Sequence, residues 1–251
     1  MPTDEHPNEE TLRRLLSEAR ERGDETVVVE AAPSVADAWL RAGFRERART
    51  LEASIEALEH RVGSHDAPSF GSVHVQTDDL DGVVRAVRQY VPRMPGSSKG
   101  SVVVPPRNGW VTVYDELSDR EPEMLRRLAR ELSDRMGAVV LLLGVEQGAV
   151  VRFVLFERGR IMDEYLSVPD FHGELPPGDV IALHANPTVL ARLTGADPAD
   201  VRRVIRTGNA PEELPAAPEL VREVAGVLGV EGAEHGYAAA ERIPGSVLLE
   251  R

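Results

Sequence analysis

The chain alternates between segments in which apolar residues recur every three to four positions and shorter runs that are apolar throughout or alternate with polar residues. The first spacing is typical of amphipathic helices and the second of strands. The first helical stripe consists of Leu12, Leu15, Leu16 and Ala19. Asn8 occupies a suitable N-cap position and Gly23 a suitable C-terminal stop. The pattern therefore predicts a helix between these two residues.

Three further elements and a linker are predicted before residue 70. The β-branched run at 25–31 predicts a short buried strand, and Pro33-Ser34 opens a second helix that continues through Leu40. Residues 45–55 can alternate outward charges with small inward groups, which predicts one strand. Periodicity is then lost at 62–69, where Gly, Ser, His, Asp and Pro accumulate, so we expect a linker there.

The middle of the chain predicts a regular succession of strands and helices. The strands are expected at 70–76, 101–107, 110–116, 138–145, 149–157 and 161–168. Helices are expected at 80–91 and 120–137, and Asn108-Gly109 is a strong hairpin signal. The order strand-helix-strand-strand-helix-strand, followed by two more strands, is typical of a ferredoxin-like fold. Both helices would then pack on one face of a sheet rich in antiparallel pairs.

The last part of the chain changes character at Pro169, where Pro and Gly become frequent and short helical patterns follow. Those helices are expected at 187–195, 197–208, 217–230 and 234–243. We predict that they form a helical tail packed on the sheet. The sequence thus predicts an α+β protein with a first segment at 1–61, a linker at 62–69, a ferredoxin-like domain at 70–168 and a helical tail at 169–251.

Composition narrows the class of protein. Hydrophobic residues make up 42% of the chain and charged residues 28%, as in globular proteins with a buried core. The net charge of −13 disfavours nucleic acid as a partner, because binding depends on contacts with phosphates. The longest apolar stretch, 138–145, is far too short to span a membrane, and the N-terminal region has no apolar signal segment. We expect a cytoplasmic protein that binds neither nucleic acid nor membrane.

Several kinds of chemistry are disfavoured by residue type or spacing. The chain has no cysteine, which excludes disulfides, thiolate nucleophiles and cysteine-ligated zinc. Its seven histidines never occur in H-x-H or H-E-x-x-H spacing, so no metal site is predicted. Lys99 is the only lysine among 29 basic residues, a bias typical of GC-rich bacterial genomes, and arginines are therefore weak markers of a site. The stretch 96–101, GSSKGS, lacks the spacing of a phosphate-binding loop and is expected to be a connector.

One motif links the first segment to a known family. Residues 11–55 contain a helix that ends on glycine, an apolar strand and a short helix that ends in Trp-Leu-Arg-Ala-Gly-Phe at 39–44. This succession, with an aromatic residue four positions before Gly-Phe, resembles the C-terminal half of a GCN5-related N-acetyltransferase (GNAT). The resemblance covers under a fifth of the chain. It implies a final pair of strands after the motif and acetyl-CoA as the cofactor.

The features with which that family binds and protonates its cofactor are missing here. The resemblance implies a Gln/Arg-x-x-Gly-x-Gly/Ala loop before the first helix, where backbone N–H groups cradle the pyrophosphate. That region has no glycine in this chain, and its carboxylates are those of Asp4, Glu5, Glu9 and Glu10. Trp39 replaces the tyrosine that often protonates the departing thiolate, and an indole is not a general acid. We expect no catalytic residue and no cofactor, and we regard Trp39 and Phe44 as packing residues or as part of a binding surface.

Two aspartates in the middle of the chain are candidates for a second site. Asp115 and Asp163, each followed by a glutamate, lie in or directly after predicted strands. If these strand ends converge, the two carboxylates near Arg107 or Arg152 could serve acid–base chemistry or bind a cation. Capping of a following helix and solvation of the strand ends are the alternative explanation. These four residues are the candidates for a binding surface in this domain.

Two functional hypotheses follow. In the first, the protein is a non-catalytic binding, regulatory or interaction module, with a partner protein, a second copy of itself or a small molecule as its ligand. In the second, it is an acyl-CoA-dependent enzyme whose cofactor site is completed by a dimer partner or by an upstream segment. The short sheet of the first segment would leave the strand at 25–31 with an open edge. Because such edges are normally covered, we expect the second domain or a second copy of the chain to cover it.

Overall fold

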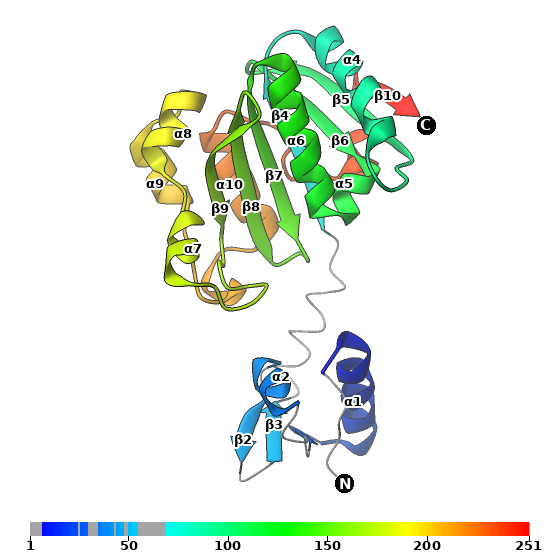
Figure 1. Ribbon diagram of the computed structural model, residues 1–251, viewed down its shortest axis with the longest axis vertical. Coiled ribbons are helices and arrows are strands. Elements are labelled where there is room, and N and C mark those ends of the chain that lie inside the picture. The colour runs from blue at the N-terminus through cyan, green and yellow to red at the C-terminus, as the bar shows by residue number, and fades with distance from the viewer. Residues whose placement is uncertain are drawn as a thin grey trace. The chain divides into compact units, whose positions relative to one another are not determined.

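The computed structural model describes residues 7–24, 26–29, 35–42, 44–47, 50–54 and 69–250. The chain divides into two compact units, Met1–Ala67 and Pro68–Arg251. Each unit has its own sheet, helices and hydrophobic core (Figure 1). The predicted linker, except Ser69, lies outside the described residues, as do Gly43, Asp4 and Glu5.

The first unit contains two helices and a small antiparallel sheet. Its elements are α1 (Glu9–Arg22), β1 (Thr26–Val29), α2 (Ala36–Arg41), β2 (Arg45–Arg47) and β3 (Thr50–Ser54). The strand order is β1-β3-β2. The predicted ends of α1 are confirmed: the side chain of Asn8 accepts a hydrogen bond from the Thr11 backbone N–H at 2.9 Å, and Gly23 adopts a left-handed conformation with φ of 72°.

The prediction of one continuous strand at 45–55 is wrong. The chain reverses between β2 and β3, which pair in antiparallel register with Arg47 opposite Thr50. The same alternation of charged and small residues continues from β2 into β3. Because the alternation is not interrupted in the sequence, the pattern predicts one strand in place of two. The pair of strands that the family resemblance implies after the Gly-Phe motif is thus present.

The core of the first unit joins both helices to the sheet. It consists of Leu12, Leu16, Ala19, Val27, Val29, Val35, Trp39, Ala42 and Phe44. The rings of Trp39 and Phe44 meet edge to face, with centroids 4.9 Å apart, a favoured geometry for aromatic pairs. The spacing of these two aromatic residues therefore serves packing, and both are buried.

The second unit is an α+β structure built on a seven-stranded antiparallel sheet with the order β10-β5-β6-β4-β7-β8-β9 (Figure 1). The strands are β4 (Phe70–Gln76), β5 (Gly100–Arg107), β6 (Trp110–Asp115), β7 (Val139–Glu146), β8 (Val150–Glu157), β9 (Arg160–Leu166) and β10 (Val247–Glu250). The hairpin predicted at Asn108-Gly109 is confirmed. Both residues have positive φ, 52° and 79°, as the tightest hairpin turns require.

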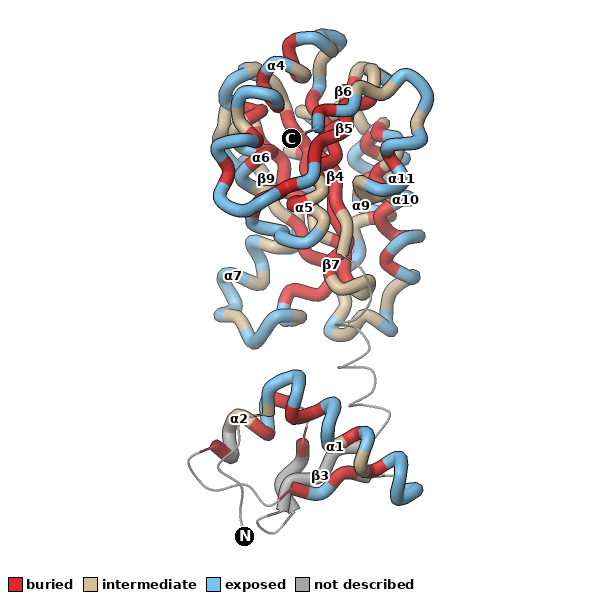
Figure 2. Tube along the Cα trace, turned by 90° about the vertical axis from the view of Figure 1, so that its right-hand side faces the viewer, coloured by how far each residue is buried: buried red, intermediate tan, exposed pale blue. Residues whose placement is uncertain are grey.

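Helices cover both faces of this sheet. The helices are α4 (Leu80–Tyr90), η1 (Val91–Arg93), α5 (Glu116–Arg120), α6 (Pro122–Met136), α7 (Pro177–Ala182), α8 (Pro187–Thr194), α9 (Pro198–Val204), η2 (Pro211–Glu213), α10 (Ala217–Val227) and α11 (Tyr237–Ala240). The two helices predicted for the middle of the chain, α4 and α6, pack on one face, while α8, α9 and α10 contribute to the core on the other (Figure 1). Buried residues accordingly follow the strands between the two helical layers (Figure 2).

The sequence pattern predicts that the last part of the chain is helical, but the structure also contains a strand there. Its final strand, β10, pairs with β5 and places Val247 opposite Val103. The helix expected at 234–243 is reduced to the four residues of α11. A strand of four residues is too short to show alternation, and Gly236 begins a new turn inside the expected helix.

None of the helices in the described part of the chain combines the length and the apolar character needed to cross a membrane.

Each unit can be followed separately in solution, because the chain has two tryptophans and each is buried in a different unit. We predict that Leu16→Ala lowers the unfolding free energy of the first unit by about 2–5 kcal/mol, the usual cost of truncating a buried leucine. Denaturant unfolding of a Trp110→Phe background, followed by Trp39 fluorescence, measures this. The Trp110 transition in a Trp39→Phe background should not move.

Leu190→Ala, a truncation in the core of the second unit, is the matched control and should shift only the Trp110 transition. A common shift of both transitions with either substitution would contradict separate cores.

Candidate functional site

The predicted pair of aspartates does not form a site. Asp115 lies on β6 and Asp163 on β9, and β4, β7 and β8 lie between these strands. Four steps across a sheet separate them by about 19 Å. Their carboxylates therefore cannot act together on one substrate.

Asp115 instead organises the end of β6. Its carboxylate accepts hydrogen bonds from the hydroxyls of Ser98 and Ser101, at 3.0 and 2.6 Å. It also accepts one from the Leu117 backbone N–H at 3.2 Å and so caps α5. The side chain is fully buried. Helix capping, the alternative explanation, accounts for this aspartate.

Arg152 belongs to a chain of ion pairs across the α6 side of the sheet. It contacts Glu146 at 2.5 Å and Glu164 at 3.1 Å. Arg126 of α6 binds Glu164 through two nitrogens, and His172 binds Glu146. Burial opposes ionisation of Glu146, but the hydrogen bond from His172 and the charge of Arg152 lower its pKa. Every charge in this series of ion pairs is neutralised by a neighbouring charge, which favours a structural role for the series.

Asp163 holds a loop against β9. It accepts hydrogen bonds from the backbone N–H groups of Asn186 at 2.7 Å and Glu164 at 3.1 Å. Burial raises the pKa of its carboxyl, and these two donors oppose that rise. All its interactions in the described part of the chain are with backbone groups nearby.

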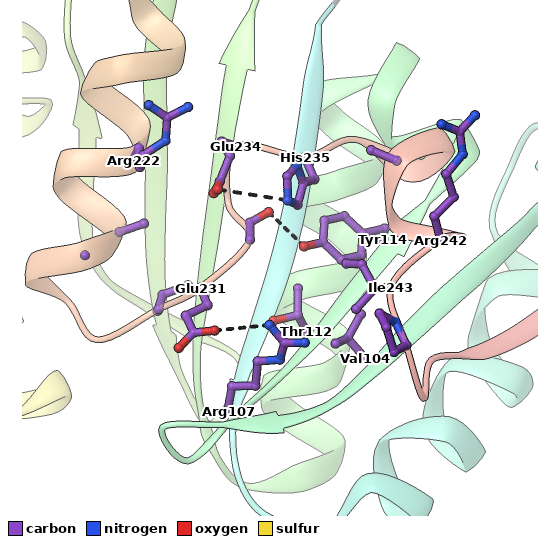
Figure 3. A pocket seen from close by; sticks show the side chains of 16 residues that line it. Val104, Arg107, Thr112, Tyr114, Arg222, Glu231, Glu234, His235, Arg242 and Ile243 are labelled. Atoms are coloured by element: carbon purple, nitrogen blue, oxygen red, sulfur yellow. Dashed lines mark hydrogen bonds and ion pairs between the residues drawn. The ribbon is translucent and has the colours of Figure 1, made fainter.

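Arg107 is the one of these four candidates that lines a large cavity. The cavity has a volume of about 470 Å³ and lies on the sheet face formed by β5 and β6, opposite the face that α4 and α6 cover (Figure 3). Its other walls are α10, the loop between α10 and α11, and the segment that follows α11. We call this cavity the cleft.

The loop between α10 and α11 forms one wall because glycines let it pass close to the sheet. The Tyr114 hydroxyl of β6 donates a hydrogen bond to the Gly232 carbonyl at 2.7 Å. Gly232 has a φ of 83°, and a Cβ there would lie 2.5 Å from the tyrosine oxygen. A side chain is therefore excluded at this position by both space and backbone conformation.

The opposite wall is held by a half-buried carboxylate. Asp119 of α5 accepts hydrogen bonds from the backbone N–H groups of Tyr237 at 2.7 Å and Gly71 at 3.1 Å. Burial raises the pKa of Asp119 to about 6. This side chain joins α11 to β4.

The charged groups of the cleft differ in how they are paired. Arg107 binds Glu231 at 3.2 Å, and Glu234 lies 3.9 Å from His235 (Figure 3). Arg222 of α10 and Arg242, which follows α11, are exposed, and within the described residues neither guanidinium has a hydrogen-bond or ion-pair partner.

A buried polar network lies beneath the cleft. Thr112, which lines it, shares a hydrogen bond of 2.9 Å with Nδ1 of His74, and Nε2 of His74 shares one of 2.8 Å with the Ser72 hydroxyl. Complete burial lowers the pKa of His74 to about 3. The imidazole is therefore neutral at physiological pH, with one nitrogen as donor and the other as acceptor.

Two of these groups, Tyr114 and His74, are poorly suited to proton transfer. Burial raises the pKa of Tyr114, whose hydroxyl is already engaged with a carbonyl, and His74 resists protonation. A general acid or base needs a pKa near the working pH, and neither group meets that need. No group of three or more potential metal-ligating side chains exists in the described part of the chain.

Most residues of the cleft were not recognisable from the sequence. The signal that could have indicated it is the glycine spacing at 226, 229, 232 and 236, typical of backbone that passes close to another element. Arg222 and Arg242 carry no such signal, because arginine is the usual basic residue of this chain.

No protein family, curated protein or solved structure with which the chain was compared matches it.

The buried histidine makes stability depend on pH. Because the pKa of His74 is about 3 in the folded protein and near 6.5 when unfolded, the unfolded state binds more protons between these values, and stability falls as pH falls below 6.5. We predict a loss of about 2 kcal/mol from this residue between pH 7.5 and pH 5. Urea unfolding of the second unit over this range measures it as the difference between the wild type and His74→Gln, because Asp119, whose pKa is raised to about 6, contributes in the opposite sense in both proteins.

His184 is exposed, so His184→Gln should retain the wild-type pH dependence. Equal pH dependence of His74→Gln and the wild type would contradict the prediction.

Proposed function

We propose that the protein is a non-catalytic binding module whose second unit holds a small molecule in the cleft. The observation that carries this proposal is the cleft itself. Its volume of about 470 Å³ falls in the range of small-molecule sites. Apolar side chains such as Val104 and Ile243 line it together with hydroxyl and charged groups that can orient a ligand.

The second unit is, in this proposal, a ferredoxin-like domain with additions. The order β5-β6-β4-β7, with all neighbours antiparallel and α4 and α6 on one face, supports this assignment. Strands β8 and β9 extend the sheet on one side and β10 on the other. The face without α4 and α6 is then free to be covered by the tail, and the cleft arises there.

The first unit is, in the same proposal, a degenerate acetyltransferase-like segment retained for interaction. The succession of helix, strand, short helix and strand pair supports the resemblance. Trp39 is 1% exposed and packs on Phe44, so it is poorly placed to meet a substrate. Glu9 and Glu10 lie in the first turn of α1, where their charges would repel a pyrophosphate.

The cytoplasmic location stays a prediction.

A second copy of the chain is the partner that we propose for the first unit. Within the described residues, β1 pairs with β3 alone, and Val28 on β1 is 58% exposed. We predict a concentration-dependent dimer in sedimentation equilibrium. Val28→Lys should shift it toward monomer, because lysines on an edge strand oppose strand pairing.

Leu40→Lys is the matched control, since Leu40 is also an exposed apolar residue of this unit but lies on α2. A protein that stays monomeric at all concentrations, or equal weakening by both substitutions, would contradict pairing through β1.

The cleft can be narrowed without strain. Gly226 lies in α10 and lines the cleft, and a Cβ added to it would have no neighbouring atom within 4 Å. Gly226→Leu should therefore narrow the cleft, and leucine favours the helix over glycine. We predict that a compound that raises the thermal midpoint of the full chain loses this effect in Gly226→Leu. Saturating ligand adds about 2.7 kcal/mol at a hundredfold excess over Kd.

Gly178→Leu is the control, because Gly178 also lies in a helix, α7, and a Cβ there would likewise have no neighbouring atom within 4 Å. A metabolite library that includes CoA and acetyl-CoA is the ligand set. A shift that persists in Gly226→Leu would count against the cleft. A shift by CoA that is independent of Gly226 would favour an acyl-CoA-dependent function instead.

A further inference from the structure

We propose that the ligand of the cleft carries a carbonyl oxygen that accepts a hydrogen bond from the Thr112 hydroxyl, and that the buried side chains of His74 and Ser72 orient this hydroxyl as a donor. This inference rests on the proposed function and names the chemical class of its ligand.

The three residues of this network lie on one face of the sheet. Thr112 of β6 is paired with His74 of β4. Ser72 lies two positions before His74 on the same strand, so both side chains point to the same face. Ser72 and His74 are 0% exposed, whereas Thr112 is 6% exposed and lines the cleft (Figure 3). The network therefore meets the cleft through Thr112.

The hydrogen bonds of the network favour one tautomer of His74. Within the described residues, the hydroxyls of Ser72 and Thr112 each have only His74 as a partner. In the Nδ1–H tautomer, Nδ1 donates to Thr112 and the Ser72 hydroxyl donates to Nε2. In the Nε2–H tautomer, Nε2 donates to Ser72, whose own proton is then buried without an acceptor in this part of the chain. Because an unsatisfied buried donor is destabilising, the Nδ1–H tautomer is the stable one.

This tautomer leaves the Thr112 proton available to a ligand. The Thr112 oxygen accepts the hydrogen bond from Nδ1 at 2.9 Å, so its own proton needs a different acceptor. No other group of the described chain accepts it. Since Thr112 lines the cleft, an acceptor atom of a bound molecule can meet this proton.

The surroundings of Thr112 favour a carbonyl group on an apolar body. Val104 lies opposite Thr112 on β5, and Ile243 also lines the cleft. The other hydroxyl of the lining, that of Tyr114, already donates to the Gly232 carbonyl at 2.7 Å. A single carbonyl oxygen would satisfy the one hydroxyl donor that stays free, and apolar atoms attached to it would cover the neighbouring apolar surface.

The tautomer can be measured in the unmodified chain. A long-range ¹H–¹⁵N correlation spectrum of the imidazole groups distinguishes a protonated ring nitrogen from an unprotonated one, and His74→Gln identifies the His74 signals. We expect Nδ1 to carry the proton. A proton on Nε2 would overturn the inference, because Thr112 would then donate to Nδ1 and have no proton left for a ligand.

Two probes of the same shape test the acceptor: acetophenone, and α-methylstyrene, in which a CH₂ group replaces the carbonyl oxygen. Their affinities for the full chain are measured by NMR titration. We expect acetophenone to bind about fivefold more tightly, which corresponds to about 1 kcal/mol for one neutral hydrogen bond. Thr112→Val should remove this preference, and Thr112→Ser, which keeps the hydroxyl, should retain it.

Thr188→Val is the matched control, because Thr188 is an exposed threonine of α8 outside the cleft lining, and it should retain the preference. Equal binding of both probes, weakened by Gly226→Leu, would overturn the carbonyl assignment and leave the proposed function standing. A preference that survives Thr112→Val would overturn the role of Thr112. Binding of neither probe would overturn the inference, and the library screen then decides the proposed function separately.

Discussion

The burial of both faces of the seven-stranded sheet is the constraint on which the second unit depends. Strands such as β7 are apolar at nearly every position, so each face exposes side chains that must be removed from water. The helices α4 and α6 can cover one face only. The segments after β9 must therefore cover the other, and α8, α9 and α10 do so. The glycine-rich loop between α10 and α11 lies against the sheet on this face. The cleft is the space between this loop, α10 and the sheet.

The sequence predicts β4 to β9 and the long helices well, because each carries an apolar run or an apolar period over six or more residues. Asn8 and Gly23 at the ends of α1, and Asn108-Gly109 in the hairpin, were recognisable since each meets a local backbone requirement. Strand β10 was not, since it exists through its pairing with β5, about 140 residues earlier in the chain. The reversal between β2 and β3 was hidden by an unbroken alternation. A local sequence pattern indicates a local backbone requirement, such as a helix cap or a turn. Pairing between strands that are far apart in the sequence produces no local pattern.

The candidate site was predictable only in part, for a related reason. Arg107 was singled out and does line the cleft, but the site hypothesised for Asp115 and Asp163 required their strand ends to converge, and three other strands separate them. The residues that complete the cleft come from α10, from the glycine loop and from the segment after α11, none of which adjoins β5 or β6 in sequence. In the first unit the aromatic spacing indicated packing as one of two roles, and packing is the role observed, because Trp39 and Phe44 are close in both sequence and space.

In the wall that the glycine loop forms, one set of groups attaches the loop to the sheet and another set faces the cleft. The hydrogen bond that fixes the loop uses the carbonyl of Gly232 and the hydroxyl of Tyr114, so it does not depend on the side chains of the loop. Glu234 and His235 face the cleft without securing the wall through that bond, whereas the Glu231 carboxylate also ties the loop to Arg107 and Asn108 of the hairpin. Substitutions at Glu234 and His235 can therefore change the chemical character of the cleft while the loop keeps its course. Under the proposed function, ligand preference can therefore diverge among descendants of this sequence faster than the fold, with each change made one residue at a time.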